Sequence, residues 1–306
     1  MSGNIRRECT SKAYTVGGFA PSPTREEVAI SRLVSAGYVP LLRRIQARPE
    51  EVLTMIEQVT HCLDVLFHHV GILHREVSLH NVMWQPSESH SGGEGNFVLC
   101  DFDLPVPVDR GSEVDGALSS EATRIATEPR RTGTLPFLAL ELLIDDSTPH
   151  RLYHDYESLL WVVLWCALKV DYHDKNTDRA AIDKILNGWQ STNLNRIYCK
   201  KRQVLEASWL ALPLSQRFKS SMPIMFSLEA FSLLIVKAPA DVKGMQLAEV
   251  MSVKFGAKAR SRGDMMDSLV CKKTIMEALE GAAKQAEELE ARMAAASRSQ
   301  PEPLAT

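Results

Sequence analysis

Two oxygen-bearing side chains in the first half of the chain have the types and spacing to bind a divalent cation together. Asn81 begins a short β-rich run, Asn81 to Trp84, and Asp101 lies near the end of a second run, Phe97 to Phe102. If the two runs pair as a hairpin, the amide and the carboxylate meet at one end of it. Both are hard oxygen donors, which suit Mg2+. Glu76, five positions before the amide, adds an acid that could orient a reacting hydroxyl.

Four sequence blocks surround these residues in a fixed order. They read GILHREVSLHN at 71–81, VLCDFD at 98–103, RTGTLPFLALE at 131–141 and HDYES at 154–158. Each block is a weak signal alone, but together they resemble the catalytic half of a protein kinase, specifically the fungal-type protein kinase family. The resemblance is dense over 71–168 and thin over 24–70 and 170–210. It implies a protein-kinase-like C-terminal lobe, an α+β fold that is mainly α with a small β-hairpin.

The resemblance implies a reaction and assigns three residues to it. Asp101 and Asn81 would be the metal ligands and would bind the cofactor, and Glu76 would take the position of the catalytic acid. The implied activity is ATP-dependent phosphoryl transfer to a protein Ser or Thr, with ATP and Mg2+ as cofactors. Without the resemblance, Asp101 and Asp103 could be an acid pair at a loop entry, Asn81 a turn residue and Glu76 a surface acid. Scattered acids rarely reproduce the whole set of spacings.

Three further residues receive structural or regulatory roles from the resemblance. His74 would pack beneath the site and bond to the backbone, with a minor role as an acid or base left open. Arg75 would face the polar segment 104–132 and pair with a phosphate there, or would only neutralise a neighbouring acid. Asp155 would accept hydrogen bonds from the backbone of the Arg75 loop and cap the buried helix.

The segment Gly133 to Glu141 would, by the same resemblance, dock a protein substrate or partner. We refer to these nine residues as the docking segment. Thr134 lies in it, and Glu141 ends it. The candidate acceptors of a regulatory phosphate are Thr123, Thr127, Thr132 and Thr134.

Three departures from the family pattern bear on turnover. Glu76 stands where the family has Asp, and a displacement of about an ångström can cost about a hundredfold in rate. Asp103 replaces the usual Gly, an acid that the fungal family tolerates. Only about 50 residues precede a helix expected from Pro49, too few for the lobe that supplies a Gly-rich cover and a strand Lys. The strand-like run Val28 to Ser31 ends in Ser instead of that Lys. We therefore expect weak turnover, and the alternative is a catalytically dead, pseudokinase-like interaction module.

Hydrophobic periodicity predicts the elements that must position these residues. Apolar residues recur at helical spacing from Val52 to Val70, between Pro49 and Gly71. The run Leu159 to Leu168 is apolar all round, which indicates a central helix without a solvent face. Further helices are predicted at 177–190, 193–210 and 225–237, and a short strand at Arg32 to Ser35.

The chain divides into four parts by composition. We expect a disordered arm at 1–23, the kinase-like lobe at 24–270, a terminal helix at 271–296 and a disordered tail at 297–306. In the terminal helix, Ile275, Leu279, Ala282, Ala286, Leu289 and Met293 follow a short heptad pattern. The pattern is shorter than a coiled coil usually requires, so we favour a solvent-exposed helix. Weak self-association through 275–293 is the alternative.

Composition argues against nucleic-acid and membrane partners. The formal net charge is −3, so there is no global basic field to attract nucleic acid. Leu159 to Leu168, taken as the longest nearly uncharged apolar stretch, is about half the ~20 residues that a membrane helix needs. The six cysteines lack metal-binding or disulfide-framework spacing, which favours reduced thiols and an intracellular, cytoplasmic or nuclear protein.

Overall fold

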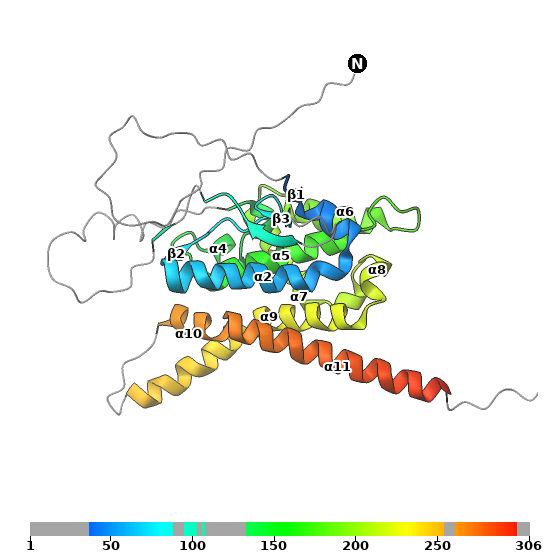
Figure 1. Cartoon of the computed structure of the whole chain (residues 1–306). Coiled ribbons are helices and arrows are strands. Elements are labelled where there is room, and N and C mark those ends of the chain that lie inside the picture. The colour runs from blue at the N-terminus through cyan, green and yellow to red at the C-terminus, as the bar shows by residue number, and fades with distance from the viewer. Residues whose placement is uncertain (1–36, 88–94, 103–105, 108–132, 254–260, 299–306) are drawn as a thin grey trace, which may run out of the picture.

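The computed structural model describes residues 37–87, 95–102, 106–107, 133–253 and 261–298 (Figure 1). The predicted mainly α fold with a small antiparallel sheet is confirmed. Several predicted features lie outside the described residues, namely the arm at 1–23, Ser31, the strand Arg32 to Ser35, Asp103, Thr123, Thr127, Thr132 and nearly all of the tail.

Two of the α-helices precede strands β3 (Val82–Pro86) and β4 (Gly95–Leu99) in the chain, and the others follow them. The α-helices are α1 (Leu41–Ala47), α2 (Val52–Val65), α4 (Leu140–Ile144), α5 (Leu152–Lys169), α6 (Arg179–Trp189), α7 (Leu194–Glu206), α8 (Gln216–Lys219), α9 (Met222–Val253), α10 (Arg262–Leu269) and α11 (Lys272–Arg298). The short helical turns are η1 (Pro49–Glu51), η2 (Leu66–Val70), η3 (Leu135–Phe137) and η4 (Trp209–Ala211).

The predicted hairpin forms two of the three strands of the larger sheet. Strand β3 (Val82–Pro86) pairs antiparallel with β4 (Gly95–Leu99), from Val82 opposite Leu99 to Pro86 opposite Gly95. A two-residue strand that the sequence analysis missed, β1 (Val39–Pro40), pairs with the other edge of β3. A separate two-stranded ladder joins β2 (Ile72–Leu73) to β5 (Val106–Pro107).

The predicted helix between Pro49 and Gly71 is confirmed, and it consists of three consecutive helical segments, η1, α2 and η2. Helix α2 contacts β4, so the helix packs against the hairpin. Gly71 ends the helix with a φ of 79°, a left-handed conformation that Gly adopts at little cost. The chain therefore turns directly from the end of η2 into the loop that contains His74, Arg75 and Glu76.

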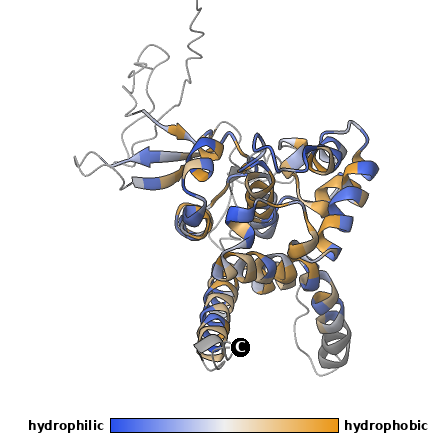
Figure 2. Cartoon of the chain, turned by 90° about the vertical axis from the view of Figure 1, so that its right-hand side faces the viewer, coloured by the Kyte–Doolittle hydropathy of each residue, from blue (hydrophilic) through white to orange (hydrophobic). Residues whose placement is uncertain are grey.

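Helix α5 is the centre of the molecule. Every residue from Leu152 to Leu168 is buried, as expected for a helix that is apolar on all sides. The helix begins seven residues earlier than the apolar run Leu159 to Leu168, so Asp155 and Glu157 lie within its first two turns. Figure 2 shows the sheet at one side of this helical body, with α11 running away from the body toward the C-terminus.

The structure corrects the expectation of a solvent-exposed terminal helix. The heptad residues Ile275, Leu279, Ala282 and Ala286 are buried, because α11 packs along α9. The opposing face of α9 repeats with steps of three and four, at Leu228, Phe231, Ile235, Ala238 and Val242. The short heptad of α11 thus has its partner within the same chain, and only its last members, Leu289 and Met293, are exposed.

Helix α9 is longer than predicted and contains a longer apolar segment than Leu159 to Leu168. Its segment Met222–Gln246 is long and apolar enough to cross a membrane by length and composition, and 44% of its most apolar window is buried in the protein. The estimate from Leu159 to Leu168 overlooked this segment because Glu229 and Lys237 interrupt it. One face of α9 packs against α10 and α11, and the core helix of a soluble protein passes the same test.

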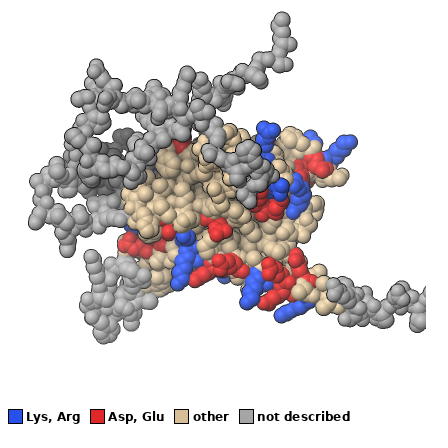
Figure 3. All heavy atoms as spheres, viewed as in Figure 1, with Lys and Arg blue, Asp and Glu red and all other residues tan. Residues whose placement is uncertain are grey.

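The charged surface is mixed in sign. Figure 3 shows basic and acidic side chains side by side over the described part of one face, without a large patch of a single sign. This distribution agrees with the formal net charge of −3.

We expect the shortening of a buried side chain on the central helix to destabilise the fold. Leu160 on α5 is fully buried, so Leu160→Ala should lower the free energy of unfolding by about 2–5 kcal/mol through lost burial and a residual cavity. Leu210→Ala is the matched control, because Leu210 is 59% exposed. Urea unfolding monitored by circular dichroism measures both. Equal midpoints for the two variants would contradict the central position of α5.

Candidate functional site

A single backbone hydrogen bond brings Asn81 and Asp101 to the same end of the hairpin. The N–H of Cys100 donates to the carbonyl of Asn81 over 2.7 Å, one step beyond the pair Val82 and Leu99. Asn81 therefore lies opposite Cys100, and Asp101 is the next residue. The sequence analysis expected this juxtaposition of an amide and a carboxylate.

Asn81 is held in one orientation. Its side chain is buried, and Nδ2 donates to the carbonyl of Glu76 over 2.8 Å. This bond occupies the amide nitrogen, so Oδ1 is the atom of the side chain suited to face a cation. Because the acceptor is Glu76, the same contact fixes the loop that carries the predicted catalytic acid.

Asp101 differs from Asn81 in exposure and in backbone. Its side chain is exposed, and its φ of 65° lies in the left-handed region. A non-Gly residue with positive φ is uncommon, and Asp tolerates this conformation better than most residues. Such strained residues concentrate at functional sites.

His74 joins the loop to the end of β4. The N–H of Glu76 donates to Nδ1 of His74 over 3.3 Å, so Nε2 carries the proton and donates to the carbonyl of Cys100 over 3.0 Å. The ring also packs edge-on against Phe102, with centroids 4.9 Å apart. Burial lowers the pKa of His74, so the ring is neutral. Both ring nitrogens are engaged with backbone groups, which is the structural arrangement expected for His74.

Asp155 fixes the other side of the loop from within α5. The N–H of Arg75 donates to Oδ1 and Oδ2 of Asp155 over 3.1 and 3.4 Å, and Nε2 of His150 contacts Oδ1 over 2.8 Å. Burial alone would raise the pKa of Asp155, but His150 and the Arg75 N–H lower it. Arg75 itself has a φ of 70°, so this contact restrains a strained backbone.

The expectation that Asp155 caps the central helix is wrong. The N-terminal cap of α5 is Arg151, four residues earlier, and its N–H donates to Nδ1 of His154 over 3.0 Å. The prediction placed the helix start too late, because it followed only the uncharged part of the helix.

The docking segment runs beside the Arg75 loop. Gly133 has a φ of 119°, and a Cβ added there would lie 3.5 Å from the carbonyl of Arg75. The next residue, Thr134, is exposed, and its carbonyl accepts from the N–H of Phe137 over 2.8 Å to begin η3. The positive φ at position 133 favours Gly, because Gly adopts this conformation at little cost.

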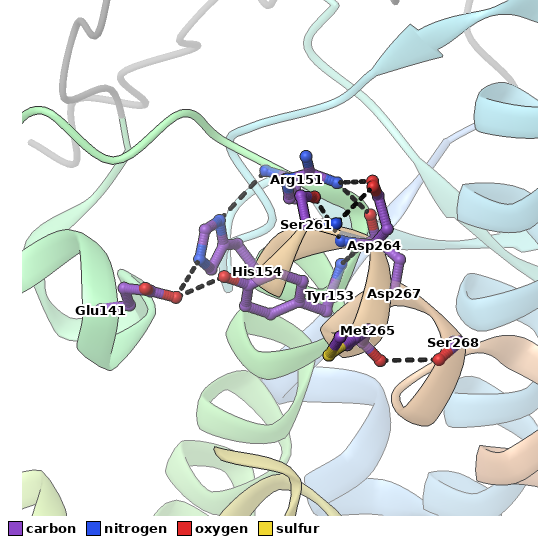
Figure 4. Close-up of polar contacts among 9 residues, drawn as sticks. All are labelled: Glu141, Arg151, Tyr153, His154, Ser261, Asp264, Met265, Asp267 and Ser268. Carbon is purple, nitrogen blue, oxygen red and sulfur yellow. Dashed lines mark hydrogen bonds and ion pairs between the residues drawn. The ribbon is translucent and has the colours of Figure 1, made fainter. Parts of the chain in front are cut away.

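Glu141 anchors the end of the docking segment (Figure 4). Its carboxylate accepts hydrogen bonds from the hydroxyl of Tyr153 and the guanidinium of Arg262, and Nε2 of His154 donates to it over 3.4 Å. Burial would raise the pKa of Glu141, but these neighbours lower it to about 2. The carboxylate is therefore ionised throughout the neutral range.

Helix α10 brings Arg262 to this position. Arg151, at the start of α5, donates to Asp264 over 3.0 Å and to Asp267 over 2.9 Å (Figure 4). Ser261 and Asp264 cap α10 reciprocally. The sequence analysis missed this part of the site, because no motif connects α10 to residues more than 100 positions earlier.

A buried acid and a buried lysine lie beneath the docking segment. Glu157 on α5 accepts from the N–H of Leu140 over 2.7 Å, and Lys201 on α7 donates to the carbonyl of Leu138 over 2.6 Å. The sequence analysis assigned a role to neither. Ile197, Lys201 and Val204 are spaced by four and three and are all buried, so helical periodicity could have shown that Lys201 lies on the inner face of α7.

The donor set suits a cation that arrives with its substrate. Among the residues that the structure describes, no group of three or more His, Cys, Asp or Glu could hold a metal ion. Asn81 and Asp101 supply one amide and one carboxylate. Mg2+ is commonly held by one or two carboxylates together with substrate phosphates and water, so two oxygen donors fit it.

Comparison with known proteins gives a match to a protein family. A family model described as fungal protein kinase matches residues 6–167, more than half of the 306 residues. No curated protein matches the chain.

We expect acid to destabilise the fold through its buried histidines. Burial lowers the pKa of His154 from 6.5 to about 4 and also lowers that of His74. Below pH ~6.5 the unfolded chain binds more protons than the folded one, so the free energy of unfolding falls by up to ~1.4 kcal/mol per pH unit for each histidine. This contribution is fully present above pH ~7.

Urea midpoints at pH 7, 6 and 5 measure this dependence. His154→Gln should reduce the slope, and His173→Gln should not, because His173 is exposed. Identical slopes for the wild type and His154→Gln would contradict a neutral, buried His154.

Proposed function

The chain belongs to the fungal protein kinase family, and from this premise we propose that it is a protein-kinase-like C-lobe that binds Mg-ATP. We further propose that it transfers phosphate slowly to Ser or Thr of an intracellular protein, and that nucleic acids and membranes are not its partners. The observation that supports the proposal is the backbone hydrogen bond from Cys100 to Asn81, which puts the exposed Asp101 next in the chain to the residue opposite Asn81.

The proposed roles follow the family pattern, and contacts of the loop from His74 to Asn81 support them. Asn81 Oδ1 and the Asp101 carboxylate would hold Mg-ATP, whose metal neutralises charge between the phosphates. Glu76 would accept a hydrogen bond from the attacking hydroxyl, at the end of a loop restrained by His74 and Asp155. A partner peptide would lie along the docking segment, next to Arg75 and Glu76. Arg75 would pair with a phosphate on the segment 104–132.

Glu76 supports slow rather than fast transfer. Its side chain is one methylene longer than the Asp of the family pattern, and a misplaced reacting group can cost about a hundredfold. The loop backbone on either side of Glu76 is fixed by His74 and Asn81, so the backbone cannot readily shift to absorb the added length.

A second candidate function is a protein-interaction module without catalysis. The observation that favours it is the set of contacts on the docking segment, made by Glu157, Lys201 and the partners of Glu141. None of these contacts involves Asn81 or Asp101. A partner could therefore bind there without any nucleotide.

Calorimetric titration with Mg-ATP tests the proposed site. We expect wild-type protein to bind, Asp101→Asn to lose binding because a neutral amide holds the cation poorly, and Asp146→Asn to behave like the wild type. Asp146 is an exposed acid after α4 and serves as the matched control. Absence of binding by the wild type would contradict the nucleotide site and leave the interaction module.

Shortening Glu76 tests its role as the catalytic acid. Glu76→Asp should raise the rate of phosphorylation of a degenerate Ser/Thr peptide library by up to about a hundredfold, since the carboxylate regains its position. Glu57→Asp on the exposed face of α2 is the control and should leave the rate unchanged. A lower rate for Glu76→Asp would contradict the assignment.

A further inference from the structure

Lys201 is a fully buried lysine on α7. Its Nζ donates to the carbonyl of Leu138 over 2.6 Å and lies 4.4 Å from the ring centroid of Trp161. Lysine is almost never fully buried unless it has partners. Lys201 thus holds a backbone carbonyl of the docking segment that precedes α4 and has no place in a helix or ladder.

Glu157 holds the same stretch of backbone from α5. Its Oε1 accepts from the N–H of Leu140 over 2.7 Å and from Nε1 of Trp161 over 3.1 Å. Leu140 is the first residue of α4, so its N–H has no acceptor within that helix. Lys201 and Glu157 together bind the two peptide groups that flank Ala139, and Trp161 lies between them.

Apolar contacts also hold α4 against α7. Leu138, Ala139, Leu142, Leu143 and Ile197 form an apolar cluster between these helices. Buried opposite charges contribute little net stability compared with apolar residues of similar size. The hydrogen bonds from Lys201 and to Glu157 fix the orientation of the backbone, because they bind the carbonyl of Leu138 and the N–H of Leu140.

We propose that Lys201 and Glu157 are positioning residues that hold the backbone of the docking segment at Leu138 and Leu140 and so set where a protein substrate or partner binds. The inference rests on the proposed function, in which this segment docks a protein. It adds α7 to the parts of the chain that determine recognition, although α7 lies outside residues 6–167.

The pKa values of Lys201 and Glu157 determine the pH at which the proposal is tested. Burial lowers the pKa of Lys201 to about 7 against the opposing effect of Glu157. Burial likewise raises the pKa of Glu157, with Lys201 opposing and Glu141 on α4 reinforcing. At pH 8, above that pKa, Lys201 is mostly neutral in the wild type as well, and the neutral amine still donates to Leu138. Exchange at this pH therefore reports the loss of hydrogen bonds.

Hydrogen–deuterium exchange of full-length protein at pH 8 without nucleotide tests the proposal. Lys201→Met removes the bond to Leu138, and Glu157→Leu removes the bonds from Leu140 and Trp161, while each keeps a side chain of similar size. We expect either change to accelerate exchange in peptides covering 134–143 by about tenfold to a hundredfold, as when a buried backbone group loses its partner. Glu157→Gln keeps an acceptor for Leu140 and should stay near the wild-type rate.

Two controls make the result specific. Lys200→Met changes the neighbouring lysine of α7, which lies against Gly188 of α6 and bonds to Gln203, and should leave exchange unchanged. Exchange in α2 and α9 should not change in any variant. The proposal is overturned if Lys200→Met matches Lys201→Met, if exchange accelerates throughout the chain, or if Glu157→Gln behaves like Glu157→Leu. Should Lys201→Met fail to fold, the two Glu157 variants decide alone.

A kinetic measurement separates this inference from the proposed activity. With the peptide library, Lys201→Met and Glu157→Leu should raise the KM for peptide several-fold and leave the KM for ATP unchanged. Local exchange that accelerates while the peptide KM stays constant would overturn the recognition role. A chain without phosphotransfer would refute the proposed activity, and the exchange experiment would still decide whether Lys201 and Glu157 hold the segment.

Discussion

The arrangement of the candidate site depends on the two backbone hydrogen bonds of Cys100. Its N–H donates to Asn81 and its carbonyl accepts from His74, so the end of β4 is bound to both ends of the loop from His74 to Asn81. The loop is closed internally by the bond from Asn81 to Glu76. These bonds continue the pairing of β3 and β4 past Val82 and Leu99 and connect it to the loop that Asp155 restrains.

The sequence predicted the parts of the structure that rest on local patterns. The helix up to Gly71, the hairpin of β3 and β4 and the buried helix α5 each have a periodicity or a turn signal of their own. The junction of Asn81 with Asp101 followed from pairing the two strands. The start of α5 was misplaced because His154, Asp155 and Glu157 are polar residues that tertiary contacts, not local preference, place inside a buried helix.

The parts that the sequence did not predict involve contacts between distant segments. Lys201 belongs to a basic run of Lys200, Lys201 and Arg202 that suggests solvent exposure, and only the carbonyl of Leu138 and the ring of Trp161 explain its burial. The heptad of α11 was detected, but its partner was not. The face of α9 that covers Ile275 and Leu279 lies within a helix whose apolar residues extend over most of its surface. The sequence of α9 alone therefore did not show which face packs against α11.

The ion pair between Glu141 and Arg262 has a consequence for biosynthesis. The two residues are 121 positions apart, and Arg262 lies in α10, which the ribosome makes after nearly all of the other helices. During translation Glu141 is made before Arg262, so the two residues cannot pair while α5 through α9 are being synthesised. At synthesis rates of about 5–20 residues per second, that interval lasts on the order of ten seconds. The nascent chain therefore passes through a stage in which α5 through α9 have been made and Glu141 is not yet paired with Arg262.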